Sequence, residues 1–542
     1  MVSVLRRNFY VIGIIYALIA LVIFPKWTID DAYIIYRYAD NLAKYGELTW
    51  NVGQDPIEGY TGLVLPVILA LFIKLGLSPV LMGKIIGIGS YFLGGLLLAL
   101  ALKKLEVSDL ARSIALLLYF TAPFSFSHAW GGLETTLYSA MLMMCTYLLL
   151  NVVTSRQPRQ SAEIWLCVAL LFTSLVRPEA ALLAGISFLA ILYIKRRGRK
   201  GDLRAFVIRF ILIYAIPGLI YFLWRWQYYG QLFPNPFYVK SNPGLISKGS
   251  LLSLALFTIY YLLIPTLVCL AVYLTHPRRV RERLSERYFS GAKSGVKIAL
   301  LAILAFAVLI YLQYLRSRLL INFEFRFFAQ YYPIFLLFVG AFLSAGCGVL
   351  QEKGQNVAKI WIGLLVAIQL AVNVAHLNKY RFLRSAYEDM ITQEHIPAGL
   401  FVRESVPPEE WLIVVHDAGA IPYYARHKTV DFGRLNNEYL LQKKLSQSDI
   451  LDYFFSFNAG AVVMTSFKWN EVSQLWIFGR EAEQIVHDPR FDRYVLVKKY
   501  KTDAAPGSPS SEYFEFLFLR KNLYAAWNSG VNLEGQGKGS QL

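Results

Sequence analysis

Cysteine is scarce in this chain, and the few cysteines present offer no evident chemistry. Four occur among 542 residues, and each lies inside an apolar run. Their spacing fits neither a metal cluster nor a disulfide framework, so we interpret them as small buried hydrophobic residues. They leave the redox compartment undetermined. The four are Cys145, Cys167, Cys269 and Cys347.

Acidic residues are also few relative to basic ones. The chain has 36 Asp and Glu against 54 Lys and Arg, for a formal net charge of +18. Such a charge can indicate nucleic-acid binding, but here the basic runs stand at the ends of hydrophobic segments, as the positive-inside rule requires. We therefore expect anionic membrane lipid, and no nucleic acid, as the partner of this charge.

Apolar sequence is what the chain has in abundance. Hydrophobic residues make up 56% and aromatic residues 15% of it, and the mean hydropathy is +0.44. Several apolar runs approach the ~20 residues that cross a ~30 Å hydrocarbon core, and helices are the form such runs take. Residues 8–24 follow two arginines without a small-residue cleavage site, which predicts an uncleaved anchor helix. The composition predicts a polytopic α-helical membrane protein.

The apolar run 63–77 decides the predicted topology. If this run crossed the membrane, three downstream basic clusters would lie outside, against the positive-inside rule. The run is also short and contains Pro66 and Lys74, which suits an interfacial or re-entrant helix. We therefore place it on the outer side, within one large external loop at 25–78.

Eleven membrane spans are then predicted, and the basic clusters become cytoplasmic. An odd number of spans leaves the C-terminal region outside. We expect a multi-pass protein of the inner (plasma) membrane whose active face and C-terminal domain are extracytoplasmic. The predicted spans are 8–24, 79–102, 109–125, 135–152, 163–176, 180–194, 205–224, 251–275, 295–315, 331–350 and 357–376.

The composition changes from membrane to soluble after the last predicted span. We predict a transmembrane domain at 1–377 and a soluble extracytoplasmic domain at 378–530, with a disordered Gly- and Gln-rich tail at 531–542. Short apolar runs bounded by turn residues predict strands, and helical segments between them predict an α/β domain. The strands are predicted at 411–416, 459–464, 494–497 and 514–519, helices at 439–444 and 470–476, and a flexible loop at 504–511.

Two adjacent carboxylates stand at the start of the first external loop. Asp30 and Asp31 precede a segment, 32–45, that has no Pro or Gly and is followed by Gly46, which predicts a helix and its end. One acid suits the N-terminus of a helix as a cap. A cap needs only one acid, so the second is available as a general base. Both interpretations stay open at this point.

The residues around this pair resemble the first external loop of GT-C glycosyltransferases. The resemblance rests on the run from Asp30 to Asn41, on Trp50-Asn51 and on Glu58 to Thr61, and it is closest to the mycobacterial terminal arabinofuranosyltransferase group. It implies a GT-C membrane fold and transfer of a sugar from a polyprenyl-phosphate carrier, with an Asp of this loop as the base. Arabinofuranose is the implied first sugar to test. Further matches are Gly132 to Thr135, Arg177 to Glu179 and Pro234 to Lys240.

Sugar transfer from a polyprenyl phosphate makes three demands on the external loops. A base takes the proton of the acceptor hydroxyl, cations stabilise the leaving phosphate, and aromatic and polar side chains hold the sugar. We assign the base to Asp31 or Asp30, with a slight preference for Asp31. The phosphate donors are Arg326, Lys240, Arg177 and His128. The sugar and acceptor contacts are Tyr36, Arg37, Glu58, Tyr60, Trp130, Glu134, Tyr238 and Tyr331.

Several of these residues also have a simpler structural interpretation. Glu324 is close enough in sequence to pair with Arg326. His128 is an isolated histidine that equally suits a hydrogen-bonded interfacial position. Arg177 and Glu179 are placed to pin the turn around the proline between them.

Metal use has two interpretations. Asp30 and Asp31 together with Glu58 provide oxygen ligands suited to a hard divalent cation. A monophosphate leaving group can instead depart with Arg and Lys alone, because it needs only charge and geometry. We expect the second, with no metal and no cofactor at this site.

The leading hypothesis is an inverting GT-C enzyme whose partners are a polyprenyl-phosphate sugar donor and a glycan, glycolipid or protein acceptor. A transporter or flippase of lipid-linked sugars is the alternative, although such proteins often have repeated halves and ionisable groups near the membrane midplane. This chain has no internal repeat, and its acids cluster in external loops. A non-enzymatic scaffold that binds polysaccharide leaves those acids without a role.

Overall fold

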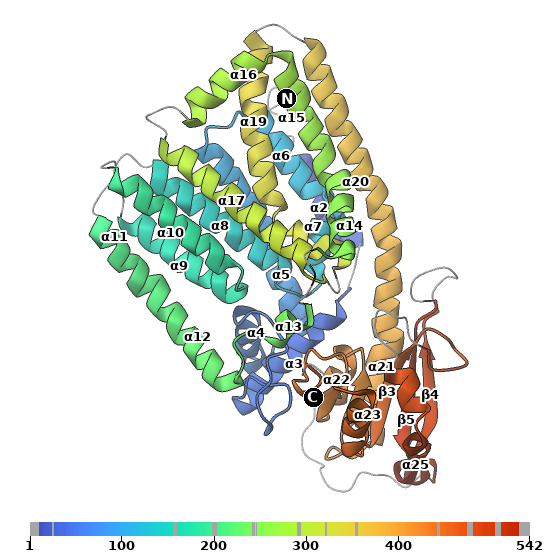
Figure 1. The fold of residues 1–542 in the computed structure, drawn as a ribbon. Helices are drawn as coiled ribbons and strands as arrows, with labels where there is room; N and C mark the ends of the chain where they lie inside the picture. Colours follow the sequence, from blue (N-terminus) through green and yellow to red (C-terminus); the bar gives the residue numbers. More distant parts are fainter. Residues whose placement is uncertain are drawn as a thin grey trace.

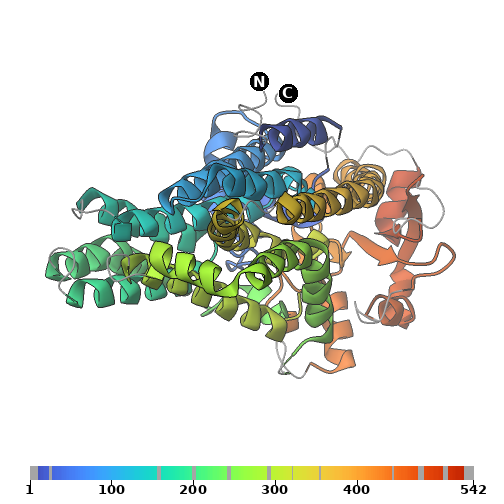
Figure 2. The same ribbon diagram turned by 90° about the horizontal axis from the view of Figure 1, so that it is seen from above.

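The chain forms a large helical bundle joined to a smaller sheet domain (Figure 1). The structure is a computed structural model that describes residues 10–23, 27–154, 160–197, 203–240, 244, 246–289, 294–319, 322–352, 356–441, 445–473, 481–503 and 511–529. The predicted tail at 531–542 lies outside these residues. Seen from above, the sheet domain lies to one side of the bundle (Figure 2).

The first half of the bundle contains helices α2 to α10. Their bounds are α2 Tyr10–Ile23, α3 Asp30–Tyr45, α4 Val64–Lys74, α5 Pro79–Lys104, α6 Asp109–Thr121, α7 Pro123–Trp130, α8 Thr135–Thr154, α9 Gln160–Val176 and α10 Ala180–Arg196.

The second half of the bundle contains several helices interrupted by π-helical turns and, at Phe323–Phe325, by a 3₁₀ turn. They are α11 Leu203–Phe210, η1 Ile211–Ala215, α12 Ile216–Tyr229, α13 Asn235–Lys240, α14 Lys248–Phe257, η2 Thr258–Leu262, α15 Leu263–Thr275, α16 Pro277–Leu284, η3 Ser285–Phe289, α17 Ser294–Arg316, η5 Phe323–Phe325, α18 Arg326–Ala329, α19 Tyr332–Glu352 and α20 Asn356–Met390.

Helices lie over each of the eleven ranges that hydropathy predicts as spans. Within the described residues, five helices are long and apolar enough to cross a membrane, or seven if each of two bent helix pairs is one span. The bent pairs are α6 with α7 and the segment Phe323–Ala329 with α19. The chain therefore has the helices of a polytopic membrane protein, and the count of eleven crossings stays a prediction.

Helix α4 covers the apolar run whose placement decided the predicted topology. It has 11 residues, Val64–Lys74, and at 1.5 Å per residue is about 16 Å long, well short of the hydrocarbon core. Its N-terminal part is buried, and Leu65 and Leu69 pack in the same hydrophobic cluster as Tyr36 and Tyr38 of α3. The run thus forms a short helix packed on α3, and its position relative to the membrane stays a prediction.

Helix α3 begins at Asp30 and ends before Gly46, as predicted. Gly46 adopts φ 76°, a left-handed conformation that favours glycine, and its N–H donates to the Leu42 carbonyl at 3.2 Å. The N-cap residue is Ile29, and no side chain caps the helix. Neither Asp30 nor Asp31 is the N-cap, because both are already helical residues, although both lie in the first turn, where an acid suits the helix dipole. The two carboxylates have other partners.

A continuous helical segment connects the bundle to the sheet domain. Helix α20 runs through the wider turn η6, Ile391–His395, into α21, Ile396–Ser405. The boundary predicted at residue 377 falls inside α20, where Figure 1 shows one long helix descending from the bundle to the sheet. The two parts are therefore linked by a helix and not by a flexible linker.

The sheet domain has five strands in the order β2-β1-β3-β5-β4. Strand β1 is parallel to β2 and β3, and β5 is antiparallel to β3 and β4. Strand β1 is buried on both faces, which explains its continuous apolar sequence. The strands are β1 Leu412–Val415, β2 Thr429–Asp431, β3 Ala461–Ser466, β4 Tyr494–Lys501 and β5 Phe514–Arg520, and the helices are α22 Ala420–Ala425, α23 Gln447–Ser456, α24 Glu481–Val486 and α25 Lys521–Asn528.

Four of these strands lie where the sequence predicted them, and the domain combines helices with a sheet as expected. Strand β2 was missed because its three residues are too few for a periodic pattern. The helix predicted at 439–444 is a short turn at Tyr439–Leu441, and residues 442–444 lie outside the described residues. The helix predicted at 470–476 is wrong for residues 470–473, which are bends and irregular chain. The remainder of that segment, and residues 504–510 of the predicted loop, lie outside the described residues.

Candidate active site

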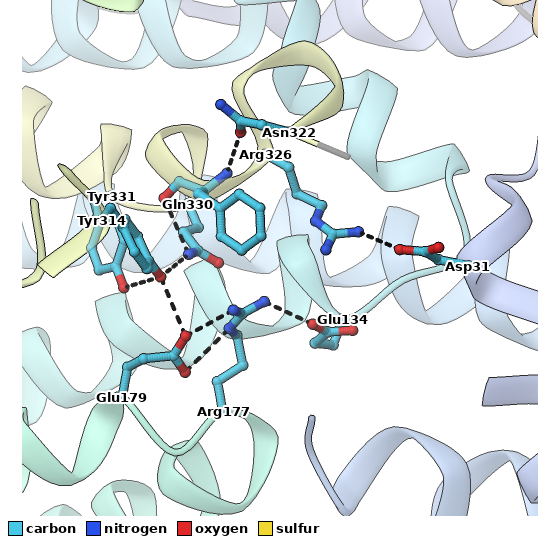
Figure 3. A network of polar contacts seen from close by, with 10 residues as sticks. Asp31, Glu134, Arg177, Glu179, Tyr314, Asn322, Arg326, Gln330 and Tyr331 are labelled. Atoms are coloured by element: carbon cyan, nitrogen blue, oxygen red, sulfur yellow. Dashed lines mark hydrogen bonds and ion pairs between the residues drawn. The ribbon is translucent and has the colours of Figure 1, made fainter. Parts of the chain in front are cut away.

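Asp31 faces a buried arginine that lies far from it in the sequence. Its Oδ2 atom lies 3.5 Å from Nη1 of Arg326 (Figure 3). The two residues are 295 positions apart in the sequence. The Arg326 side chain is 7% exposed, and its Nε atom has no hydrogen-bond partner among the described residues. A buried cation with a free donor beside a carboxylate is suited to binding an anion.

The backbone that presents Arg326 is locally strained. Glu324 and Phe325 adopt φ values of 49° and 58°, which non-glycine residues rarely adopt. The Asn322 side chain stabilises this turn by accepting a hydrogen bond from the Phe327 N–H at 3.2 Å. Strain of this kind is retained where the surrounding structure imposes it, commonly at functional sites.

His128 lies against the same turn. Its Nε2 atom is 3.1 Å from the Glu324 carbonyl oxygen, and its side chain is buried at the end of α7. This contact links α7 to the strained segment. His128 therefore supports the turn that positions Arg326.

Three cations predicted to bind phosphate converge on one aromatic ring. The Phe327 ring centroid lies 4.9 Å from the guanidinium of Arg326, 5.3 Å from the ammonium of Lys240 and 5.6 Å from the guanidinium of Arg177. These cations come from α18, α13 and the turn between α9 and α10. The fold thus brings together side chains from three predicted external loops.

Arg177 is already engaged by two carboxylates. Its Nη1 atom lies 2.9 Å from Glu134 and its Nη2 atom 2.8 Å from Glu179. The Tyr314 hydroxyl donates to Glu179 at 3.4 Å and lies 3.3 Å from the Tyr331 hydroxyl (Figure 3). Arg177 is thus held inside a closed polar network. Glu134 and Tyr331 belong to the same network.

Lys240 is the least engaged of the three cations. Its ammonium makes no hydrogen bond or ion pair within the described part of the chain, and its side chain is half-buried at the end of α13. Burial, together with the nearby charge of Arg326, lowers the pKa of Lys240 to about 8, while Asp31 opposes this shift. Arg326 and Lys240 are the cations that remain available to a ligand.

The environment of Asp31 suits a base. Burial raises the pKa of the Asp31 carboxyl above its ordinary value, and the charges of Arg326 and Lys240 act against this rise. A carboxylate with a raised pKa accepts a proton more readily than an exposed one. Asp31 is also only partly exposed, at 15% of its side chain.

The neighbouring carboxylate, Asp30, turns toward the sheet domain. Its Oδ1 atom accepts a hydrogen bond from the Ala420 N–H at 2.8 Å and lies 3.2 Å from Nδ1 of His395. The Asp30 N–H donates to the Tyr387 hydroxyl at 3.1 Å. Asp30 therefore connects α3 to the C-terminal domain.

Arg37 makes a second connection to that domain. Its guanidinium donates to the carbonyls of Pro422 and His427 at 2.8 and 2.7 Å. It also donates to the Trp50 carbonyl and the Asn51 side chain, each at 2.9 Å. The donors of Arg37 are thus used within the protein, where they join the first loop to the sheet domain.

The other first-loop residues predicted to contact sugar are also buried and paired. Glu58 lies 2.6 Å from Arg225 of α12, and burial raises the pKa of Glu58 to about 7 against the opposing effect of this arginine. The Tyr60 hydroxyl lies 3.0 Å from that of Tyr229. The Tyr36 hydroxyl donates to the Gly132 carbonyl at 3.4 Å. These contacts anchor the loop against α12 and the α7–α8 turn.

Two of the predicted aromatic side chains have either an N–H without a partner among the described residues or an exposed ring. Trp130 is half-buried, and its Nε1–H has no hydrogen-bond partner among the described residues. Tyr238 is 36% exposed and precedes Lys240 on α13 by two residues. These side chains remain candidates for contact with a sugar.

The carboxylates considered for a hard cation have three separate partners. Asp30 contacts His395, Asp31 contacts Arg326 and Glu58 contacts Arg225. This arrangement does not support a cation held by Asp30, Asp31 and Glu58 together. His395 and Arg225 were not identified from the sequence, because their partners lie 365 and 167 positions away and no local pattern marks them.

Comparisons with known proteins agree with this architecture. A family model described as a domain of unknown function, DUF8728, matches residues 383–516. This range contains the end of α20, η6, α21 and most of the sheet domain. No curated protein matches the chain in sequence.

Solved structures of similar fold cover most of the chain. ArnT from Cupriavidus metallidurans bound to undecaprenyl phosphate has a TM-score of 0.54 and 11% identity, over 94% of this chain and 97% of that chain. The apo oligosaccharyltransferase from Archaeoglobus fulgidus has a TM-score of 0.52 and 12% identity, over 84% of this chain and 69% of that chain. AglB from the same organism, in complex with an inhibitory peptide and a dolichol-phosphate, has a TM-score of 0.50 and 12% identity over 84% and 68%. These similarities show that the chain shares the overall fold of these structures.

Proposed function

We propose that this protein transfers a sugar from a polyprenyl-phosphate carrier to an extracytoplasmic glycan, lipid or protein, with Asp31 as the general base. The observation that carries the proposal is the position of the Asp31 carboxylate beside Arg326. Arg326 and Lys240 both contact the Phe327 ring, so the two cations lie close together. Two of the similar structures contain a polyprenyl-type lipid phosphate, undecaprenyl phosphate and dolichol-phosphate. That chemistry fits the cations of this site.

The proposed reaction is a single displacement at the anomeric carbon. Asp31 takes the proton of the acceptor hydroxyl while its oxygen attacks the anomeric carbon, and the bond from that carbon to the phosphate oxygen breaks. The configuration inverts, and polyprenyl phosphate leaves with the bonding electron pair. Arg326 and Lys240 stabilise the charge that develops on the phosphate, so we propose that no metal ion is needed to neutralise the leaving phosphate.

The geometry favours Asp31 over Asp30 as the base. Asp30 already accepts a hydrogen bond from the Ala420 N–H and contacts His395. Asp31 contacts the cation that would hold the phosphate. We therefore propose that Asp30 positions the start of α3 and that Asp31 performs the proton transfer.

The sugar is proposed from the resemblance of the first loop alone. Arabinofuranose is the first candidate, because Asp30 to Asn41 resembles the arabinofuranosyltransferase group. Trp130 and Tyr238 are proposed to line the sugar, whereas the paired side chains of Arg37, Glu58 and Tyr60 shape the loop.

The decisive assay uses purified protein with radiolabelled polyprenyl-phosphate carriers of arabinofuranose, mannose, galactose and glucose. Transfer from one of them is expected, and Asp31→Asn is expected to lower kcat by about 10²–10⁴-fold, the usual contribution of a general base. Asp40→Asn is the matched control, because Asp40 is a partly exposed carboxylate of the same helix paired with Lys44. Full activity of Asp31→Asn, or carrier translocation in liposomes without transfer, would contradict the proposal.

A further inference from the structure

A second cluster of ionisable side chains lies between α3 and the sheet domain, apart from the Asp31 and Arg326 pair. It contains His395 at the end of η6, Asp417 directly after β1, and Glu515 on β5. Asp30 of α3 contacts His395 at the edge of this cluster. One ligand atom each from Asp30, His395 and Asp417 lie within 4.8 Å of one another. The described sugar-transfer site does not use this cluster.

His395 is oriented by Asp30. The imidazole is fully buried, at 0% exposure, and its Nδ1 atom lies 3.2 Å from the Asp30 carboxylate. A carboxylate on one ring nitrogen places the proton there and leaves the lone pair on the other nitrogen. In the neutral imidazole, Nε2 of His395 is therefore the nitrogen that offers a lone pair to a metal ion.

That free nitrogen points at two carboxylates but has no hydrogen bond. Nε2 lies 3.5 Å from Oε1 of Glu515 and 3.9 Å from Oδ2 of Asp417, and it has no hydrogen-bond partner within the described residues. The Thr465 hydroxyl contacts both carboxylates, at 2.5 Å from Asp417 and 3.1 Å from Glu515. The Tyr513 hydroxyl donates to Asp417 as well. The two carboxylates are thus drawn together on one side of the imidazole.

Oxygen and nitrogen ligands bind zinc at about 2.0–2.2 Å, which places two tetrahedral ligands about 3.3–3.6 Å apart. The 3.5 Å separation of His395 from Glu515 lies in this range, and the 3.9 Å separation from Asp417 is slightly longer. A histidine whose other nitrogen meets a carboxylate is a common arrangement behind a metal ligand. A cation would also neutralise carboxylates that are otherwise costly to bury together.

We propose that His395 Nε2, Asp417 and Glu515 bind one divalent transition-metal ion, with Asp30 orienting His395 through Nδ1. An imidazole together with carboxylates suits Zn²⁺ or Mn²⁺ better than Ca²⁺ or Mg²⁺, which prefer oxygen ligands alone. The ion joins η6, the end of β1 and β5 to the first turn of α3. Its role is structural, and the proposal does not depend on sugar transfer.

The test measures metal in the intact purified protein. Elemental analysis after purification in trace Zn²⁺ is expected to give one ion per chain, and X-ray absorption at the zinc edge is expected to show one imidazole ligand. Chelator-stripped protein is then titrated with Zn²⁺, Mn²⁺ and Ca²⁺ while its Tm is followed. We expect saturable stabilisation by Zn²⁺ or Mn²⁺ and none by Ca²⁺ at the same concentration.

Three variants assign the ion to this cluster. Glu515→Gln preserves the size of the side chain and is expected to abolish stoichiometric binding, as is His395→Gln. Asp30→Asn removes only the orienting carboxylate and is expected to weaken Zn²⁺ affinity by about 10–100-fold. Asp452→Asn, an exposed carboxylate paired with Arg490 in the same domain, is the control and is expected to bind normally.

Two outcomes would overturn the inference. One is intact wild-type protein without saturable metal binding, which would leave the cluster as a proton-sharing network. The other is stoichiometric binding that persists unchanged in Glu515→Gln and His395→Gln, which would place the ion elsewhere. Because the wild-type measurement and its X-ray absorption need no variant, the test stands even if a substituted protein fails to fold.

Discussion

At the scale of single residues, one phenylalanine ring organises the proposed phosphate site. Phe327 contacts Arg326, Lys240 and Arg177, but only the first two retain donors for a ligand, because Arg177 is bound by Glu134 and Glu179. The negative face of an aromatic ring stabilises nearby cations without consuming their N–H donors. The site can therefore hold positive charge in a buried position and still offer it to an anion.

Lys240 gives this site a testable pH dependence. The pKa of Lys240 is lowered to about 8 by burial and by Arg326. The lysine is charged below this pKa and loses its charge as the pH rises through it, so kcat/KM for the carrier is expected to fall above about pH 8. Lys240→Arg stays charged to a pKa above about 12 and is expected to move this alkaline limb upward.

Rates of carrier turnover from neutral to alkaline pH measure this effect. Lys44→Gln serves as the control, because Lys44 is an exposed lysine paired with Asp40, and its limb should coincide with that of the wild type. An alkaline limb at the same pH in Lys240→Arg would contradict the assignment.

Arg326 is expected to act chiefly by stabilising the transition state and less by binding the carrier in the ground state. Arg326→Gln removes a cation aimed at developing phosphate charge, and loss of one such donor typically lowers kcat by about 10²–10³-fold. Arg316→Gln, at the exposed end of α17, is the control and should behave as the wild type. A single-turnover assay with bound carrier distinguishes this from weaker binding, and an unchanged chemical rate in Arg326→Gln would exclude the role.

The sequence identified both members of the Asp31 and Arg326 pair but not their contact. Arg326 has Glu324 as an apparent partner two positions away, and no local signal indicates a carboxylate 295 residues distant. Likewise, the contact of Asp30 with His395 spans 365 residues. The residue types were enough to predict which side chains could take part in the chemistry. Which of these side chains contact one another could be found only from the fold.

At the scale of elements, hydropathy predicted helix positions well and short strands less well. Apolar runs placed helices over all eleven expected ranges, because long runs carry a strong signal. Strand β2 has three residues and no usable period. The continuity of α20 with η6 and α21 was also missed, because the composition changes from apolar to polar along this segment while the backbone stays helical.

The turn between α7 and α8 is an element whose geometry requires glycine. Gly132 adopts φ 80°, and a Cβ there would overlap the Tyr36 hydroxyl. Gly132→Ala is expected to destabilise the protein by at least about 1–2 kcal/mol, the cost of a left-handed residue. Thermal unfolding in detergent measures the loss, and Tyr36→Phe in the same protein should recover part of it.

Gly185 provides the matched control for this substitution. It lies within α10, and a Cβ there would meet nothing within 4 Å. Gly185→Ala is therefore expected to leave stability unchanged or raise it by about 0.5–1 kcal/mol. Equal effects of alanine at the two glycines would contradict the role given to the turn.

At the scale of the whole molecule, the first loop and the sheet domain form one unit. Asp30 and Arg37 contact η6, α22 and the segment before β2, and Trp50 donates to the Thr429 carbonyl at 2.9 Å. The base of the proposed reaction is adjacent in sequence to Asp30. The C-terminal domain thus contributes to the placement of α3, although it was predicted as a separate domain.

Arg37 tests this union of the two domains. Arg37→Leu removes the hydrogen bonds that the buried guanidinium donates to the Trp50, Pro422 and His427 carbonyls, and it is expected to cost at least about 3 kcal/mol. Arg37→Lys should not rescue it, because one ammonium cannot replace the planar fork. Arg434→Leu, which breaks a partly exposed pair with Glu481, should cost no more than about 1 kcal/mol.

The measurement is thermal unfolding together with limited proteolysis between the bundle and the sheet domain. Faster cleavage and a lower Tm are expected in Arg37→Leu and Arg37→Lys but not in Arg434→Leu. Wild-type stability of Arg37→Leu would show that the two parts hold together without this contact.

The central claim is that a carboxylate from the first external loop and cations from the later loops meet one lipid-borne phosphate. A structure of the protein with bound polyprenyl phosphate tests it most directly. The account predicts the phosphate within hydrogen-bond distance of Arg326 and Lys240, with the Asp31 carboxylate facing the position of the sugar. A phosphate bound away from both cations, or separated from Asp31 by the protein, would contradict it.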